Sequence, residues 1–511
     1  KEIKDRFNIE LNIVAPQVSG DAASLYQTRC ASGDLGDIII LDNADMQDCV
    51  DVGLIADISE DLPNYENLMK YDEQISLFND SINEVIGTEG VYAIPAEMNS
   101  NGPTEYKEDT VAVMPRLEWD HYVEVGAPEM TNLDDLLDTL KKIQDAYPTN
   151  EAGDKTYALS LWPDWDGTSI ENVNQLTKWY GQEVNGSILL GTDNSITPLT
   201  DKDGAYYKML KFLYKANQMG LVDPDSATQD WNAACDKMRQ GRVHLFWYNW
   251  QYVFWNSPAK GEARQNYRGI PLEDLNIYQA SDTYYGDGRA WAVGSNVSDE
   301  DKARILEFMD WLCSPEGLTM QHIGQEGFIY TVNDDGTYTL TDAGMTRFAD
   351  DPQVPEELGG GSWTDGNNQI NQWLVASIEM NPETGETFGS DYWASFLEKN
   401  NTATNKEWSE KFGSETEVSY LEENGMLNIV PNVNLVLPID TTDIALIRSQ
   451  CGDQVKATSW QAIFASDDAE FDQMWDEMCV TLEGLGWDQL VEFDTDKYQA
   501  VVDAREAAVA E

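Results

Sequence analysis

Apolar residues along the chain alternate between short continuous runs and stripes at helical spacing. Residues 38–41 (IIIL) form a continuous apolar run of strand length, which is typical of a parallel strand buried on both faces. Residues 133–143, 305–312 and 471–482 carry apolar side chains three or four positions apart, which predicts amphipathic helices. Ser298 precedes the second of these stripes and is a suitable N-cap. This alternation of strands and helices favours an α/β architecture.

Two stretches depart from the alternation. Residues 330–368 are rich in Asp, Gly, Pro and Thr, and predict a long excursion of loops with a small hairpin at residues 337–340. The chain opens with a pattern that predicts a helix over residues 1–6 and a strand over residues 9–14. We therefore expect the first strand of the fold, and any export signal, to be missing from this sequence.

Length and charge narrow the class of protein. A chain of 511 residues is too long for one compact core and points to two or three domains. It holds 92 acidic and 32 basic residues, a net charge of −60. Such a surface repels phosphate backbones and anionic lipids, so we expect no nucleic-acid partner and no membrane-surface partner. No apolar run reaches the length of a membrane span.

The residues that usually hold metals or carry out catalysis show no recognisable spacing. The six cysteines form no CxxC or Cys/His pattern, and His121, His244 and His322 stand far apart in the sequence. A nucleophile elbow and a glycine-rich phosphate loop are also missing from the sequence. We therefore expect no metal, no cofactor and no enzymatic activity.

Tryptophan, carboxylate and amide side chains gather where predicted strands end. In open α/β sheets, ligands bind outside the carboxyl ends of the strands. A glycine-rich loop over residues 359–368 adds one more ring and further polar groups. The candidate ligand-binding residues are Asp42, Asn43, Glu97, Asn99, Trp162, Trp165, Asp166, Trp247, Asn249, Trp250, Trp291, Trp363 and Asp365.

This combination of side chains suits a sugar. The apolar C–H faces of a pyranose stack on indole rings, while carboxylates and amides accept and donate hydrogen bonds to its hydroxyls. The competing interpretation is that the tryptophans belong to the core, as we expect for Trp311 and Trp475 on helical stripes. The pairs Trp162–Trp165 and Trp247–Trp250 instead straddle turn residues just past a strand, which favours rings that face a cleft.

Several short motifs, in their order along most of the chain, give the sequence a family resemblance. It resembles the family 1 extracellular solute-binding proteins of bacterial ABC importers, especially the long lipoprotein subgroup that binds oligosaccharides. The matching segments are residues 32–39 (SGDLGDII), 53–58 (GLIADI), 90–95 (GVYAIP), 241–246 (GRVHLF), 311–317 (WLCSPEG) and 324–327 (GQEG), with the helices after Thr131 and over residues 471–486.

The resemblance implies a two-lobed periplasmic-binding-protein-like fold of type II, in which hinged lobes each hold a mixed sheet flanked by helices. The N-terminal lobe would comprise residues 1–112 and 285–332, and the C-terminal lobe residues 113–284 and 333–511. The chain would cross between the lobes near residues 110–114 and 279–288, and a third time after about Tyr330.

The implied function is to capture an oligosaccharide in an aromatic-lined cleft between the lobes and to deliver it to the permease subunits of an ABC transporter. The protein would act as a monomer, outside the cell and lipid-anchored to its surface. Some long relatives carry a calcium loop near residues 150–157, but residues 150–154 lack the alternating oxygen ligands of such a loop, so we expect no obligatory calcium. The alternative from another class is a glycoside hydrolase that uses an Asp/Glu pair in an aromatic cleft.

Overall fold

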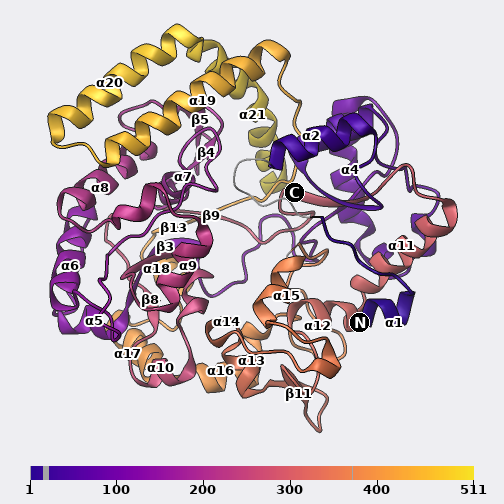
Figure 1. The fold of residues 1–511 in the computed structure, drawn as a ribbon, viewed down its shortest axis with the longest axis horizontal. Helices are drawn as coiled ribbons and strands as arrows, with labels where there is room; N and C mark the ends of the chain where they lie inside the picture. The colour runs from indigo at the N-terminus through magenta and orange to yellow at the C-terminus, as the bar shows by residue number, and fades with distance from the viewer. Residues whose placement is uncertain (1, 15–21, 371, 511) are drawn as a thin grey trace.

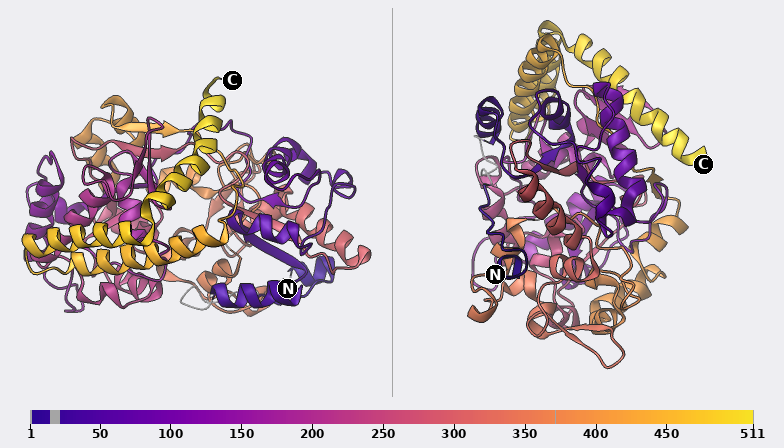
Figure 2. Two further views of the ribbon diagram at one scale, coloured as in Figure 1. Left: turned by 90° about the horizontal axis from the view of Figure 1, so that it is seen from above. Right: turned by 90° about the vertical axis from the view of Figure 1, so that its right-hand side faces the viewer.

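The computed structural model describes residues 2–14, 22–370 and 372–510, and it is a mixed α/β structure. Figure 1 shows two groups of elements side by side, with a third, smaller group below and between them. The first group holds α2, α4 and α11; the second holds α5, α6, α8, α19 and α20; the third holds α13 to α16 and β11. The last helix, α21 (Trp487–Ala510), projects from the second group in the views of Figure 2.

The first group is built on a three-stranded antiparallel sheet in the order β1 (Ile38–Asp42), β10 (Arg289–Val293) and β2 (Ile94–Pro95). Side chains alternate across the central strand, so Ala290 and Ala292 face one buried cluster while Trp291 and Val293 face another. The helices of this group are α1 (Glu2–Phe7), α2 (Ala22–Ser32), α3 (Asn43–Asp51), α4 (Asp72–Ile86), α11 (Asp299–Leu312) and α12 (Pro315–His322).

The second group contains the sheet β7 (Leu245–Tyr248), β3 (Val113–Glu118) and β8 (Tyr267–Gly269), antiparallel in that order. A parallel pair, β9 (Ile277–Ala280) with β13 (Leu427–Val430), and a meander of β4 (Gln182–Asn185), β5 (Ile188–Gly191) and β6 (Ile196–Pro198) lie beside it. Its helices are α5 (Trp119–Glu124), α6 (Leu133–Ala146), α7 (Glu171–Thr177), α8 (Ala205–Gln218), α9 (Trp231–Arg239), α10 (Pro258–Glu262), α17 (Ala403–Phe412), α18 (Glu417–Glu423), α19 (Thr442–Ile463) and α20 (Asp468–Leu485).

The third group surrounds a small hairpin, β11 (Tyr330–Val332) with β12 (Tyr338–Leu340). Its short helices are α13 (Asp342–Met345), α14 (Arg347–Asp350), α15 (Trp363–Gln369) and α16 (Ala394–Asn400). Ile329, Leu340, Trp363 and Trp393 form its own buried cluster. The loop-rich segment of the sequence is therefore a small packed unit with a core of its own.

The three apolar stripes of the sequence are confirmed as α6, α11 and α20, and Ser298 caps α11 by accepting from the backbone N–H of Asp301. A hairpin is present, but it spans residues 330–340, and the expected residues 337–340 hold only its second strand. Two expectations were wrong. Residues 38–41 pair antiparallel with β10 and leave Ile40 39% exposed, so this strand is not buried on both faces. Residues 9–14 form no strand.

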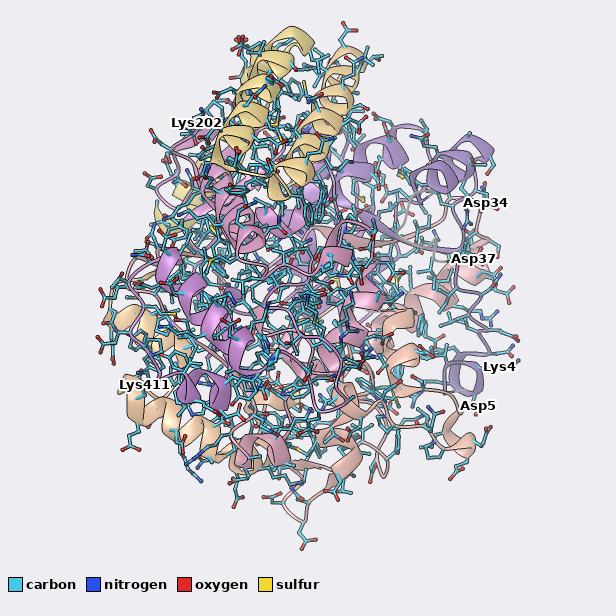
Figure 3. The ribbon with its side chains drawn as sticks, turned by 60° about the vertical axis from the view of Figure 1, so that its left-hand side comes forward. Lys4, Asp5, Asp34, Asp37, Lys202 and Lys411 are labelled. Atoms are coloured by element: carbon cyan, nitrogen blue, oxygen red, sulfur yellow. The ribbon has the colours of Figure 1, made fainter. Side chains whose placement is uncertain are left out.

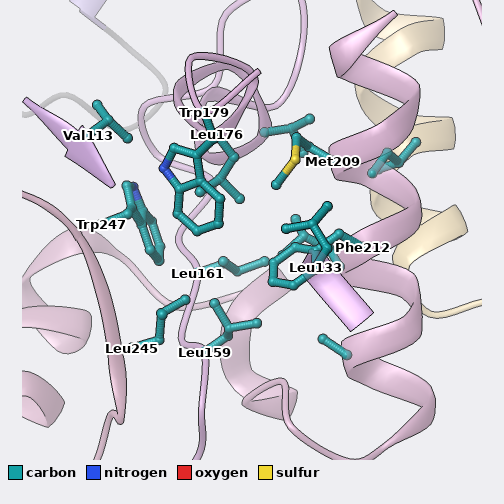
Figure 4. Close-up of a cluster of buried hydrophobic side chains, with 14 of the residues drawn as sticks. Val113, Leu133, Leu159, Leu161, Leu176, Trp179, Met209, Phe212, Leu245 and Trp247 are labelled. Atoms are coloured by element: carbon teal, nitrogen blue, oxygen red, sulfur yellow. The ribbon is translucent and has the colours of Figure 1, made fainter. Parts of the chain in front are cut away.

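Separate hydrophobic cores define the groups. The largest cluster runs from Val111 through the second group to Leu490, and Figure 4 shows part of it. Leu374, Val375 and Phe388, which the expected division places in the C-terminal lobe, pack in the core of the first group instead. Exposed charged side chains such as Asp34 and Lys202 lie on the outer surfaces in Figure 3.

Four segments pass between the cores of the first and second groups: residues 99–110, 281–285, 431–435 and 437–443. The first two lie close to the expected crossings. The third follows β13, whereas we expected it after about Tyr330, where the chain enters the third group. The crossing segments bond to one another: the N–H of Asp282 donates to Glu105 O at 2.7 Å, and that of Asn432 donates to Pro103 O at 3.1 Å.

A buried ion pair ties β3 to α18. Both carboxylate oxygens of Glu417 lie 2.6 Å from Nη1 of Arg116, and Oε1 also accepts from the N–H of Gly269 at 3.0 Å. Burial alone would raise the pKa of Glu417, but Arg116 and Arg268 hold it below its usual range. The pair joins residues 301 positions apart, so it fixes the C-terminal part of the chain to the central sheet.

We predict that Glu417→Gln destabilises the protein by about 3 kcal/mol or more, because it leaves the Arg116 guanidinium buried without its counter-charge. Chemical unfolding monitored by circular dichroism measures this loss. Asp145→Asn, which removes the partner of Lys141 in an exposed pair, is the control and should cause little change. Equal effects of the two substitutions would contradict the structural role of the buried pair.

Candidate functional site

Five tryptophans from three separate segments meet where β7 ends. We call them the tryptophan cluster: Trp162 and Trp165 from the loop before α7, Trp231 from the first turn of α9, and Trp247 and Trp250 from the end of β7 and the turn that follows. The cluster has an inner layer inside the core of the second group and an outer layer at its surface.

The inner layer is Trp162 and Trp247, which are 1% and 0% exposed. Their rings stack with centroids 5.4 Å apart and an angle of 5° between planes. Figure 4 shows Trp247 within the core that also contains Val113, Leu161 and Trp179. The expectation that these two rings face a cleft was therefore wrong, because the core of the second group takes up both of their faces.

The outer layer is Trp165, Trp231 and Trp250, of which Trp250 is 37% exposed and the other two are half-buried. The ring centroids of Trp165 and Trp231 are 4.7 Å apart, and those of Trp231 and Trp250 are 5.3 Å apart. Trp162 lies beneath Trp231 at 4.7 Å. The inner layer thus supports three contiguous indole rings that reach solvent.

Trp231 was missed by sequence reasoning because it opens a helix instead of ending a strand. Asp164 brings it into place: Oδ2 of Asp164 accepts from the backbone N–H of Trp231 at 2.9 Å. The only signal in the sequence was the tryptophan directly after Asp230, the N-cap of α9. A helix start packed against a strand end is a tertiary contact that local patterns do not report.

Polar groups border the outer rings. Asp166 accepts from Trp460 Nε1 at 2.7 Å and from the backbone N–H of Glu171 at 2.9 Å. Burial raises the pKa of Asp166 to about 6, although the hydrogen bond from Trp460 opposes this shift. Asn249, between Trp247 and Trp250, is half-buried, and its backbone N–H donates to Ala112 O at 3.0 Å.

The first-group candidates lie near the crossing segments and bond to protein. Asp42 pairs with Arg289 at 2.9 Å, and Nδ2 of Asn43 donates to Asn434 Oδ1 at 2.6 Å. Asn99 is fully buried, and its side chain accepts from the N–H of Asn101. The structure does not bring these three residues into contact with the tryptophan cluster.

Trp291 and Trp363 lie elsewhere. Both are buried, and both line an apolar cavity of about 430 Å³ between the core of the first group and the third group. Nε1 of Trp291 donates to Gln372 O at 3.0 Å. Asp365, on α15, is exposed. The described lining of this cavity includes none of the five rings of the tryptophan cluster.

Carboxylates gather around the first crossing segment. Burial, together with Asp287 and Glu108, raises the pKa of Glu97 well above its usual range. Burial, together with Asp282 and Asp391, raises the pKa of Glu108 to about 7. Glu97 and Glu108 are half-buried, and the backbone of Glu97 is in the left-handed region, with φ 61°. These carboxyl groups come from separate segments of the chain. Their like charges lie close together where the first, second and third groups of elements meet.

Tyrosines accompany these acids. The backbone N–H of Asp109 donates to Tyr392 Oη at 3.2 Å, which links the crossing segment to the third group. The guanidinium of Arg116 lies 5.5 Å from the ring centroid of half-buried Tyr252, in the turn after Trp250. The surface between the tryptophan cluster and the crossing segments therefore combines rings with hydrogen-bonding groups.

Comparison with known proteins identifies the fold. The family model described as bacterial extracellular solute-binding protein matches residues 1–319. No curated protein matches the chain.

Solved structures align over nearly the whole chain. The substrate-binding protein FusA of an ABC transporter of S. pneumoniae, in complex with kestose, is 17% identical, with a TM-score of 0.61, over 98% of this chain and 95% of its own. An HMO-binding, ABC-transporter-associated solute-binding protein of Bifidobacterium longum infantis is 16% identical, with a TM-score of 0.57, over 93% and 90%. The N-glycan transport solute-binding protein NgtS of Streptococcus pneumoniae, in complex with Man1GlcNAc, is 13% identical, with a TM-score of 0.54, over 98% and 94%.

The two layers of the tryptophan cluster predict different mutational effects. Trp247→Ala removes a fully buried indole and should destabilise the protein by about 3 to 5 kcal/mol, whereas Trp250→Ala truncates a ring at the surface and should cost far less. Chemical unfolding of both variants tests this difference. Similar losses for the two variants would contradict the division into an inner and an outer layer.

The raised pKa of Glu108 predicts that the stability of the protein depends on pH. The pKa of the Glu108 carboxyl group is raised to about 7 in the folded protein. The protonated carboxyl group therefore stabilises the folded state below the pKa that Glu108 has in the unfolded chain, and this stabilisation is lost as pH rises through about 7. Glu108→Gln should therefore raise the melting temperature by about 2 °C at about pH 8 and change it little at about pH 5. Thermal unfolding at both pH values measures this effect, with exposed Glu105→Gln as the control. An increase that is the same at both pH values would contradict the prediction.

Proposed function

The chain belongs to the family of bacterial extracellular solute-binding proteins, whose model matches more than half of its length, and from this premise we propose that it captures an oligosaccharide for an ABC transporter. The outer layer of the tryptophan cluster is the observation that carries the proposal. Trp165, Trp231 and Trp250 form a contiguous aromatic surface that reaches solvent, bordered by Asp166 and Asn249.

The chemistry of this surface fits a saccharide. An indole ring that covers about 100 Å² of the apolar face of a sugar contributes ~2.5 kcal/mol, and three rings contribute ~7 kcal/mol before the cost of association. Added hydrogen bonds to hydroxyl groups bring micromolar affinity within reach. The three aligned structures have names that refer to sugars, namely kestose, HMO and an N-glycan, which supports a saccharide as the ligand class.

The crossing segments supply the proposed hinge. Residues 99–110, 281–285, 431–435 and 437–443 join the two cores, and a change of backbone angles in these segments would swing one core towards the other. Closure would bring Glu97 and Asn99 of the first group towards the outer tryptophan layer, and Asp42 and Asn43 would lie on the same wall. The ligand favours the closed form through the additional contacts that it makes there.

Capture would be followed by delivery to the permease subunits of the transporter, without chemical change to the sugar. We propose that the protein acts as a monomer outside the cell, held at the cell surface by a lipid anchor. Over the residues that the structure describes, none of the helices is long and apolar enough to cross a membrane.

Isothermal titration with a panel of neutral oligosaccharides that includes kestose and Man1GlcNAc tests the proposal. We expect Trp250→Ala and Trp165→Ala to weaken binding of the tightest ligand at least tenfold, because each removes a stacking surface of ~2.5 kcal/mol. Phe464→Ala, which truncates an exposed ring at the C-terminal end of α19, is the control and should bind normally.

Chromatography of the titrated sugars distinguishes a binding protein from a hydrolase. Unchanged oligosaccharide together with a raised melting temperature supports capture, since a ligand of the native state stabilises it by mass action. Cleavage products would favour the hydrolase. Full affinity in both tryptophan variants would mean that the sugar site lies elsewhere.

A further inference from the structure

Two of the three histidines of the chain meet two carboxylates at the start of α5, away from the tryptophan cluster. Glu118 is the last residue of β3, and Asp120 and His121 lie in the first turn of α5. One ligand atom from each of these three residues lies within 4.8 Å of the other two. His244 enters from the residue before β7, with its ring centroid 5.5 Å from that of His121.

The contacts within this group are not those of an ordinary hydrogen-bonded pair. Nδ1 of His121 lies 3.2 Å from Oε2 of Glu118, yet it makes no hydrogen bond and is buried. The side chain of Glu118 is 5% exposed. Two ligands of a tetrahedral zinc ion, with bonds of about 2.0 to 2.1 Å, lie roughly 3.3 Å apart. The separation of these two atoms is therefore that of two ligands of one ion.

His244 is the second, independent observation. It is 1% exposed, and its Nε2 has no hydrogen-bond partner. A buried polar atom without a partner is costly and needs an explanation. The ligand atoms that lie within 4.8 Å of one another are those of Glu118, Asp120 and His121, so His244 stands next to this group without belonging to it. The ring of His244 donates a hydrogen bond to the backbone carbonyl of Tyr147, which fixes its orientation beside the group.

We infer that Glu118, Asp120 and His121 form a binding site for one divalent transition-metal ion of the zinc class, with His244 beside it. Imidazole nitrogen together with carboxylate oxygen suits zinc, cobalt or nickel better than calcium or magnesium, which prefer oxygen ligands alone. The ion would join the end of β3 to the first turn of α5, beside the start of β7. The site would be structural, since β7 leads directly to Trp247 and the tryptophan cluster.

The competing explanation is a metal-free buried pair of Glu118 and His121. The charge of Lys260 acts on Glu118 and lowers its pKa, but the Nζ of Lys260 lies over the ring of Trp255, 3.2 Å from the centroid. A protein with a net charge of −60 also attracts cations weakly over its whole surface. The experiment therefore has to report coordination geometry as well as affinity.

The test is a cobalt titration of the full chain after chelator treatment. We expect one equivalent of Co²⁺ to produce the visible absorption of a low-coordinate site with nitrogen ligands, and Zn²⁺ to abolish it by displacement. Zn²⁺ should also raise the melting temperature. Cobalt that shows only the weak spectrum of the hydrated ion, in the folded protein without substitutions, would overturn the proposal.

Variants assign the ligands. His121→Gln and Glu118→Gln should each weaken Co²⁺ binding at least tenfold and change the spectrum. The controls are Glu151→Gln, at an exposed carboxylate in the adjacent loop, and His322→Gln, at the remaining histidine. Both should keep the Co²⁺ affinity and the spectrum of the protein without substitutions. An unchanged spectrum in folded His121→Gln, checked by circular dichroism, would overturn the site. If a variant fails to fold, the titration of the protein without substitutions still decides the question.

Discussion

The backbone of the crossing segments must find hydrogen-bond partners outside the two cores, and the rest of the structure depends on how it does so. A buried N–H or C=O without a partner is costly. Here the segments bond to one another: Asp282 N–H to Glu105 O, Asn432 N–H to Pro103 O, and Ser281 N–H to Val430 O at 2.8 Å. The two cores are therefore connected by a bundle of chain segments, and among the described residues no sheet continues from one core into the other, which is the architecture that a hinge requires.

A stable core on one side of this connection supports the proposed binding surface. The outer tryptophan rings are fixed from below, because Trp162 contacts both Trp165 and Trp231 and stacks on Trp247. A ring held in one orientation loses little conformational freedom when a sugar stacks on it. The buried rings thus contribute to binding through the position of the exposed ones, although they do not face the ligand.

Features that depend on neighbouring residues could be predicted from the sequence, and features that depend on distant contacts could not. The stripes that became α6, α11 and α20 and the hairpin of β11 and β12 follow from local periodicity. Trp162 and Trp165 have similar surroundings in the sequence, and only the packing of α9 and β7 against them determines which is buried. His121 and His244 are likewise 123 positions apart (244 − 121), so no spacing rule brings them together.

The acidic residues beside the crossing segments set a condition on any ligand between the cores. Glu97 and Glu108 already oppose the charge of Asp287 and Asp391, and partial burial makes each charge costly. A sugar hydroxyl donates a hydrogen bond to a carboxylate and lowers that cost. A sugar carboxylate has no proton to donate at neutral pH and adds another like charge. In the proposed closed form, a neutral saccharide would relieve the repulsion within this group and an acidic one would add to it, so this charge arrangement would favour neutral sugars.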